Sequence, residues 1–565
     1  MSICKPIKVI SFSALFLLVA CSNLESSKKR DDSDIVKHKA VVEKDVESNK
    51  TPLAKMKPSK AEVKKMVKLS PGMIVGHSAS YPLKASYAPV MDATKEVYQK
   101  LPASKVTLVE NESVSTFSLD VDTGSYANIR RFINDGRLPD KNAVRLEEMI
   151  NYFDYQYPQP KDSEHPFKVT SSMMNTPWND ETKLLSVAIK GWQKNIEEIP
   201  PMNLVFLVDV SGSMNSKDKL PLVKKSLVML TKHLDKSDRV AVVVYAGRSS
   251  VVLESTTGDN KGEILQALEH LRSRGGTNGS AGIVMAYNIA QQHFIKDGVN
   301  RVLLATDGDF NVGISDREQL ISLIESKREQ GIFLNTLGFG SGNYNDYLME
   351  QLADKGNGFY AYIDSIFEAK KVLIDEISSS MLTIAKDVKI QLEFNPKLVH
   401  EYRLLGYENR ALAEEDFTND NVDAGEIGAG HSMTALYEIS LKNSEFKRLP
   451  EHRYNNANSV GEQTTFDNEI GWLKLRYKSP QSNVSQLISH PLTTEQLALQ
   501  QETTRDVKFA AAVAAFAQSL KQDKYLESFN FDDIIKLANN NRHYDPYGRK
   551  AEFVNLVSMA KELSR

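Results

Sequence analysis

Residues 203–214, Asn203-Leu-Val-Phe-Leu-Val-Asp209-Val-Ser-Gly-Ser213-Met214, give the strongest indication of the fold of this chain. Its first half is an unbroken apolar run, which is typical of a strand buried on both faces of a parallel sheet. Its second half places one carboxylate and two hydroxyls where that strand ends. A second apolar run, Arg301-Val-Leu-Leu-Ala305, ends in the same manner, in Thr306-Asp307-Gly308. Both acidic loops therefore follow the ends of predicted strands.

Between these loops lies Gly275-Gly-Thr277-Asn278, another polar turn. Ligands of open α/β sheets bind outside the carboxyl ends of the strands, where the strand order reverses. We therefore expect five oxygen-bearing side chains to meet at one sheet edge. They are Asp209, Ser211, Ser213, Thr277 and Asp307. Hard oxygen donors suit a hard divalent cation such as Mg²⁺. The alternative is a serine-rich turn that only caps the next helix, because Ser and Asp favour that position.

The same five positions resemble the metal-ion-dependent adhesion site of von Willebrand factor type A (VWA) domains. The resemblance implies that the hydroxyls of Ser211, Ser213 and Thr277 approach the metal, while Asp209 and Asp307 act directly or through water. It also implies that one coordination position stays open for a carboxylate of a partner protein, an Asp or Glu. Mg²⁺ is the expected ion, with Mn²⁺ and Ca²⁺ left open.

Short apolar runs alternate with helical patterns from residue 201 to residue 381, which predicts a doubly wound VWA domain of the Rossmann-like type. Its strands are expected at 204–209, 240–245, 301–305, 332–339 and 359–363. A further strand at 250–254 follows a short turn, so we expect it to pair antiparallel at an edge. The fold class is therefore multidomain α/β.

The flanking segments have the two-residue period of half-buried antiparallel strands. Val388-Lys-Ile-Gln-Leu-Glu-Phe394 alternates strictly, and Leu185-Ser-Val-Ala-Ile-Lys-Gly191 alternates before the VWA segment. We expect residues 85–200 and 382–480 to join in one β-sandwich into which the VWA domain is inserted, because insertions are tolerated where a domain's ends lie close together. Residues 481–565 are expected to be helical, with no function assigned. Asp120 and Asp122 are interpreted as caps of a turn and helix in preference to a second metal site.

Residues from 108 to the C-terminus, including Thr116-Phe-Ser-Leu-Asp-Val-Asp122, resemble bacterial lipoproteins of the YfbK type. The N-terminus agrees with this resemblance. Lys5 and Lys8 precede a short apolar stretch, so residues 1–20 are expected to be a signal peptide. The stretch ends in Leu18-Val-Ala-Cys21, which resembles a lipobox and implies lipidation of Cys21. An ordinary signal peptide with an incidental cysteine is the alternative. The residue after Cys21 is Ser22, and its resemblance to the pattern of lipoprotein sorting implies that the protein is located in the outer membrane.

Residues 21–84 are rich in lysine and poor in aromatic residues, which predicts a flexible charged tether. The whole chain of 565 residues has a net charge of −3, which gives no reason to expect nucleic-acid binding. Its two cysteines, Cys4 and Cys21, both lie within the first 21 residues. Acyl chains on Cys21 are therefore expected to provide the membrane attachment.

The sequence predicts a lipid-anchored protein of the bacterial cell envelope that binds a partner protein through a metal ion. The chain has no Gly-x-Ser-x-Gly elbow, no Gly-x-x-x-x-Gly-Lys phosphate loop and no His-Glu-x-x-His helix. We therefore expect it not to be an enzyme, and a metal-dependent hydrolase is the weaker alternative. A structural or envelope-assembly protein, in which the metal only stabilises the fold, is the other alternative.

Overall fold

The computed structural model describes residues 96–160, 165–193, 199–277, 279–308, 317–450, 466–499 and 504–565. All of them lie in the unit Pro89–Arg565. The expected signal peptide at 1–20, the lipidated Cys21 and the tether at 21–84 lie outside the described residues. No helix in the described part has both the length and the apolar character needed to cross a bilayer.

A six-stranded sheet forms the centre of an α/β domain, in the order β10-β9-β8-β5-β6-β7. Neighbouring strands are parallel except for the edge pair, in which β7 runs antiparallel to β6. Every residue of β5 and of β8 is buried, as their unbroken apolar runs predict. The strands are β5 (Met202–Asp209), β6 (Arg239–Tyr245), β7 (Ser249–Thr257), β8 (Val299–Thr306), β9 (Phe333–Phe339) and β10 (Tyr360–Ile363).

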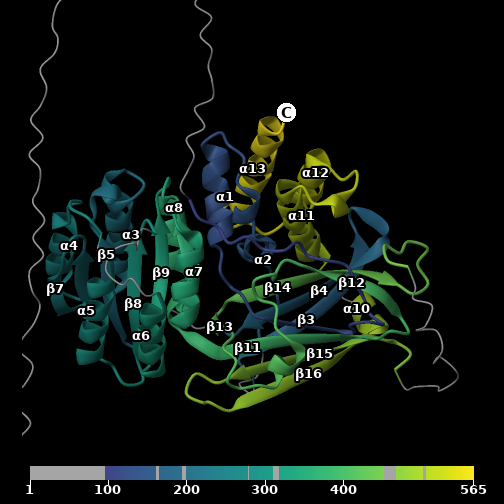
Figure 1. The fold of residues 1–565 in the computed structure, drawn as a ribbon, viewed down its shortest axis with the longest axis horizontal. Helices are drawn as coiled ribbons and strands as arrows, with labels where there is room; N and C mark the ends of the chain where they lie inside the picture. Colours follow the sequence, from purple (N-terminus) through teal and green to yellow (C-terminus); the bar gives the residue numbers. More distant parts are fainter. Residues whose placement is uncertain are drawn as a thin grey trace, which may run out of the picture. The chain divides into compact units, whose positions relative to one another are not determined.

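Helices cover both faces of this sheet (Figure 1). One face of β5, with Phe206 and Val208, shares a core with α3, α4, α8 and α9. The other face, with Val205 and Leu207, packs against α5, α6 and α7. The helices are α3 (Leu220–His233), α4 (Lys261–His270), α5 (Gly279–Gln292), α6 (Arg317–Glu329), α7 (Asp346–Lys355), α8 (Ile366–Lys370) and α9 (Ile377–Met381).

Within this domain the chain first forms β5, in the middle of the sheet. It then adds β6 on one side of β5, and later adds β8 on the other side. The strand order therefore reverses between β5 and β8, which lie side by side and parallel. A reversal of this kind leaves a crevice at the carboxyl ends of the two strands. Asp209 and Thr306 are the last residues of these strands, so both predicted acidic loops begin at the point where the strand order reverses.

Strands from before and after the α/β domain form two further sheets. One has the order β1-β12-β14-β4-β3, and the other has the order β13-β11-β15-β16 with β2 also paired to β11. Inward-facing residues of both sheets share one core, for example Val187 and Leu392. The structure thus confirms that the α/β domain is inserted into a β-sandwich. The strands are β1 (Thr107–Leu108), β2 (Val114–Ser118), β3 (Phe167–Thr176), β4 (Asn179–Gly191), β11 (Thr383–Phe394), β12 (Val399–Leu405), β13 (Gly425–Gly428), β14 (Ser432–Leu441), β15 (Glu469–Lys478) and β16 (Ser485–Thr493).

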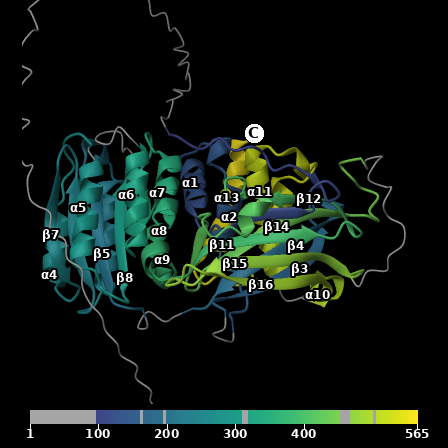
Figure 2. The same ribbon diagram turned by 60° about the horizontal axis from the view of Figure 1, so that its bottom comes forward.

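Helices from the two ends of the described chain pack together on this sandwich. Phe153, which follows α2, meets Phe509 of α11 and Phe553 of α13 edge to face, and their core includes Leu184 of β4 and Leu436 of β14. Figures 1 and 2 show α1, α13 and α11 side by side. The helices are α1 (Gly124–Asn134), α2 (Leu146–Asn151), α10 (Thr494–Leu499), α11 (Thr504–Lys521), α12 (Phe531–Asn541) and α13 (Arg549–Leu563).

The expectation that residues 481–565 are helical throughout is wrong at its start. Residues 485–493 form β16, which pairs with β15 at the edge of the sandwich. Its two buried apolar residues, Ile488 and Leu492, are four positions apart. That spacing fits one face of a strand as well as one face of a helix, so periodicity does not separate the two. Pro491 is tolerated because an edge strand leaves part of its backbone unpaired.

Candidate metal site

The first loop of the site follows β5 and is folded by its own polar groups. The Ser211 amide donates to Asp209 Oδ1 over 2.8 Å, and the Ser211 and Ser213 hydroxyl oxygens lie 2.9 Å apart. Asp209 is fully buried, Ser211 is almost so, and Ser213 is exposed. The oxygen atoms of this loop therefore lead from the buried sheet edge out to solvent.

The loop after β8 brings Asp307 to the same place. The hydroxyl of Thr306 donates to Asp209 Oδ2 over 3.0 Å and accepts from the Gly308 amide over 3.2 Å. Asp307 is fully buried, and its charge acts on Asp209. Gly308 has a φ of +83°, and a Cβ there would lie 2.5 Å from the Asn345 amide nitrogen. This turn therefore requires glycine, which keeps Asp307 close to the end of its strand.

The loop that carries Thr277 is held against the first loop through the backbone. The Gly212 amide donates to the Gly275 carbonyl over 3.0 Å, and the Arg274 amide donates to the Val210 carbonyl over 2.7 Å. Thr277 follows two residues later and is half-buried. The Ser211 amide thus links Asp209 to the first loop, where the Ser211 hydroxyl meets that of Ser213. Thr306 connects Asp209 to the second acidic loop. Thr277 is placed by the path of its loop.

The electrostatics of this site suit a cation. Burial raises the pKa of Asp209 to about 6, and the charge of Asp307 adds to that rise. The amide and hydroxyl of Ser211 and the hydroxyl of Thr306 act in the opposite direction. Two carboxylates close together in a buried place carry a cost that a nearby positive charge relieves. The oxygen donors present, carboxylate and hydroxyl, fit the preferences of Mg²⁺.

A cation that the sequence analysis did not single out already lies beside Asp307. The Lys219 ammonium is 2.9 Å from Asp307 Oδ2 and 3.2 Å from Asn343 Oδ1. Its side chain is 7% exposed, and its stem crosses Gly340, where a Cβ would lie 2.3 Å from Lys219 Cγ. One feature of the sequence could have indicated that Lys219 has a special role. Lys219 is the N-cap of α3, and a helix N-terminus disfavours positive charge.

We expect Lys219→Met to tighten Mg²⁺ binding by about tenfold, because the ammonium competes with the metal for the charge of Asp307. The methionine stem fills the same path over Gly340. Titration calorimetry of the purified protein with MgCl₂ measures this change. Lys217→Met is the matched control, since Lys217 lies two residues earlier and is exposed. Weaker Mg²⁺ binding by the Lys219 variant would mean that the ammonium supports the metal site instead.

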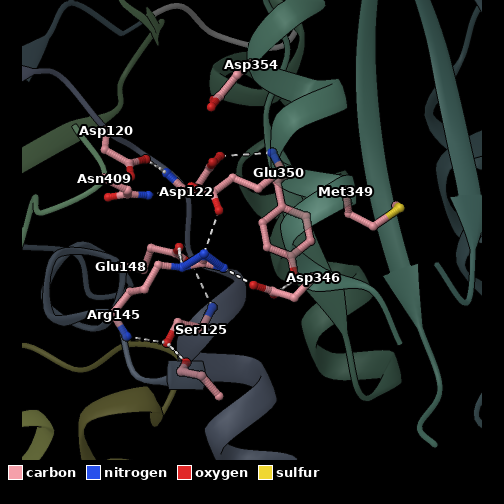
Figure 3. A network of polar contacts seen from close by, with 12 residues as sticks. Asp120, Asp122, Ser125, Arg145, Glu148, Asp346, Met349, Glu350, Asp354 and Asn409 are labelled. Carbon is pink, nitrogen blue, oxygen red and sulfur yellow. Dashed lines mark hydrogen bonds and ion pairs between the residues drawn. The ribbon is translucent and has the colours of Figure 1, made fainter. Parts of the chain in front are cut away.

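A second group of buried carboxylates lies where α7 meets the helices and loops of the sandwich (Figure 3). Among the described residues, Asp120, Glu148 and Glu350 have oxygens within 4.8 Å of one another, close enough for a metal. Two guanidinium groups already occupy this cluster. Arg145 contacts Glu148 over 2.5 Å and Glu350 over 2.6 Å, and it also pairs with Asp346. The group is therefore an ion-pair network.

The second guanidinium of this network corrects the expectation for Asp120 and Asp122. Arg410 lies 3.0 Å from Asp120, 3.3 Å from Asp122 and 3.1 Å from Glu350. Asp120 does cap a turn, since it accepts from the Asp122 amide, but Asp122 accepts from the Tyr360 amide at the start of β10. Thr123 is the N-cap of α1, without a side-chain cap. Asp122 therefore connects the inserted domain to its host directly, whereas Asp120 holds Arg410, which reaches Glu350 of the inserted domain.

Three family models match successive parts of the chain. A model described as von Willebrand factor matches residues 92–186, and the von Willebrand factor type A domain matches residues 203–376. The model described as uncharacterized protein YfbK, C-terminal, matches residues 379–563. All five residues of the candidate site fall inside the VWA match. VWA domains mediate protein–protein interactions and commonly bind a divalent metal ion.

Proteins similar in sequence agree with these family matches. The uncharacterized protein YfbK of Escherichia coli (strain K12) is 45% identical over 469 residues, which cover 82% of this chain and 80% of that protein. The chain belongs to the YfbK family. The uncharacterized protein sll0103 of Synechocystis sp. is 26% identical to this YfbK-family chain over 339 residues, covering 59% of the chain and 75% of that protein. Human inter-alpha-trypsin inhibitor heavy chain H3 is 25% identical over 278 residues, which cover 45% of this chain and 30% of that protein.

These relatives are two uncharacterized proteins and an inhibitor heavy chain. Among solved structures, the von Willebrand factor type A protein from Catenulispora acidiphila is similar at a TM-score of 0.39 and 15% identity, covering 69% of the YfbK-family chain and 89% of that chain. The conserved hypothetical protein BatB from Bacteroides thetaiotaomicron has a TM-score of 0.27 and 23% identity, and the match covers 31% of the YfbK-family chain and 97% of BatB.

Proposed function

We propose that the VWA domain of this chain holds a divalent cation, most simply Mg²⁺, at Asp209, Ser211, Ser213, Thr277 and Asp307. Through this ion it binds an Asp or Glu carboxylate of a partner protein. The observation that supports the proposal most directly is the meeting of the two acidic loops at the strand-order reversal, where Thr306 bridges to Asp209. Protein binding itself agrees with the VWA assignment.

The donor set favours binding over catalysis. Neutral hydroxyl ligands such as Ser211 and Ser213 leave much of the charge of the cation uncompensated, so it attracts an anionic ligand from outside. Mg²⁺ prefers six ligands and keeps some of them as water, and a partner carboxylate displaces such a water. Hydrolysis would also need a general base beside the metal. Lys219, the basic side chain in contact with the site, is paired with Asp307.

We further propose that the protein works at the bacterial cell envelope. Cys21 would carry acyl chains after removal of residues 1–20, and residues 21–84 would tether the folded part to the outer membrane. The short apolar stretch and the cysteine after Ala20 support this proposal. Membrane fractionation of cells that produce the Cys21→Ser variant tests it, since that variant should leave the membrane fraction.

Cross-linking in intact cells tests the metal-dependent capture. The unmodified chain should form a covalent adduct with its partner, and both a chelator and Thr277→Ala should abolish that adduct. Thr418→Ala, at an exposed threonine of the sandwich region, is the control and should leave the adduct intact. Circular dichroism of the Thr277 variant establishes that it is folded.

The alternatives are separate outcomes of the same experiment. An adduct that survives both the chelator and Thr277→Ala would contradict metal-bridged binding. A Thr277 variant that fails to fold, together with an apo protein that melts far below the metal-loaded one, would favour a metal that only stabilises the fold.

A further inference from the structure

A groove of about 590 Å³ lies between α3 and α4, next to the candidate metal site. Its apolar lining comes from Met214, Leu220, Pro221, Val228, Leu265 and Leu271. Val228 and Leu265 are half-buried, and Pro221 is exposed. Their apolar surface therefore remains open to solvent, as in grooves of this size that bind ligands.

The groove shares its wall with the metal site. Met214 follows Ser213 directly, and the Ser273 hydroxyl donates to Asn215 Oδ1 over 3.1 Å. Ser273 lies on the loop that leads to Thr277. The same two loops thus carry the three proposed hydroxyl ligands and one end of the groove. A segment held at the metal by one carboxylate would have its neighbouring residues over this apolar surface.

The rim of the groove is positively charged. It carries Lys224, Lys225 and Arg272 against a single acid, Glu269. Lys224 donates to the Glu269 carbonyl over 2.6 Å, and Arg272 donates to the Leu271 carbonyl over 2.8 Å. In the described part of the chain none of these three cations forms an ion pair with a carboxylate, and Lys225 and Arg272 are exposed, so the charges of these two face solvent. A rim of this sign favours an acidic segment.

We infer that this groove selects the partner, and that the partner segment is an acidic peptide with a large aliphatic side chain near the carboxylate that reaches the metal. The aliphatic side chain lies on Val228 and Leu265, and a second acid meets Lys225 and Arg272. The inference rests on the proposed function and adds a sequence preference to it.

Short fluorescein-labelled peptides of glycine and serine test the inference by fluorescence polarisation with the purified full chain in MgCl₂. One series carries an Asp and a Glu, and a matched series adds a Leu two, three or four residues from the Asp. The Leu peptide of the best spacing should bind about tenfold tighter than its Leu-free partner, because one more aliphatic side chain is buried.

Variants of the groove locate the effect. Leu265→Gln should remove the gain from Leu, whereas Val252→Gln, at an exposed position of the edge strand β7, should not. Changing both Lys225 and Arg272 to Glu should weaken the acidic peptides, and Lys296→Glu, at an exposed site beyond α5, should leave them unchanged. All of these positions are exposed or half-buried, so the variants are expected to fold.

The outcomes separate the two proposals. Equal binding with and without Leu overturns the groove inference and leaves metal-dependent capture standing. Leu-dependent binding that survives a chelator or an Asp→Asn peptide supports an apolar groove but contradicts capture through the metal. If calorimetry shows that Mg²⁺ binds while no peptide binds at millimolar concentration, the groove inference is wrong and the metal site remains.

Discussion

Arg145→Met should lower the free energy of unfolding by about 3–5 kcal/mol, because removal of one partner from a buried ion pair leaves uncompensated charge. The Arg145 side chain is 3% exposed and pairs with Glu148, Asp346 and Glu350. Methionine has a similar length but no charge. Urea unfolding followed by circular dichroism measures the change.

The carboxylates around Arg145 explain the size of this effect. Burial raises the pKa of Glu148 well above its usual range and also raises the pKa of Asp346, so these two partners of Arg145 already resist ionisation with the guanidinium present. Without Arg145 their ionised forms become still less favourable. The loss should therefore grow as the pH rises through the raised pKa values of these carboxylates, and it should be smaller in acid, where protons replace the guanidinium.

Two comparisons make the result interpretable. Arg137→Met removes an exposed arginine that is 3.5 Å from Asp135, and should change stability by less than about 1 kcal/mol. Adding Glu350→Gln to Arg145→Met should restore part of the lost stability, because the buried charge is then smaller. An Arg145→Met variant as stable as the unmodified chain would show that the network contributes nothing to the docking of α7.

Asp209→Asn should abolish the increase in stability that Mg²⁺ gives to the protein. Ligand binding to the native state adds about 2.7 kcal/mol at a free concentration of about 100 times Kd. The variant lacks the ionised carboxylate at the centre of the site, so its melting temperature should not depend on MgCl₂. Thermal unfolding with and without the metal measures this difference.

The metal-free Asp209 variant should be at least as stable as the unmodified protein at neutral pH. Burial raises the pKa of Asp209 from 3.8 to about 6, so the fold favours the protonated form. The ionised form is therefore destabilising, and this cost grows as the pH rises from about 4 to 6 and is constant above that. An amide carries no charge; its NH₂ group cannot accept one of the two hydrogen bonds that Asp209 receives from the Ser211 amide and the Thr306 hydroxyl, and this loss offsets only part of the gain. Asp259→Asn, at an exposed position, is the control, and a retained response to Mg²⁺ in the Asp209 variant would contradict the assignment.

The two acidic loops, which follow β5 and β8, could be predicted because each depends on a local sequence pattern. The apolar runs before Asp209 and Asp307 specify buried strands, and parallel strands bring their carboxyl ends to one edge. The insertion into a β-sandwich was also predictable, since strict alternation appears on both sides of the VWA segment. Strand β16 was missed because its apolar spacing fits a helix equally well.

Lys219 and the ion-pair network could not be predicted from local patterns. Lys219 reaches Asp307 because Gly340, from the end of another strand, leaves its stem a path. Arg145 and Glu350 are separated by 205 positions in the sequence. Nothing near either residue indicates its partner, because buried charges are paired by whichever elements the fold brings together.

Local patterns in the sequence specify the doubly wound domain, its acidic loops and its place between two halves of a sandwich, since periodicity and strand ends are local properties. The pairing of buried charges and the position of open apolar surface beside the loops are instead set by how the elements pack. Those features depend on distances between elements far apart in the chain, and such distances are fixed by packing.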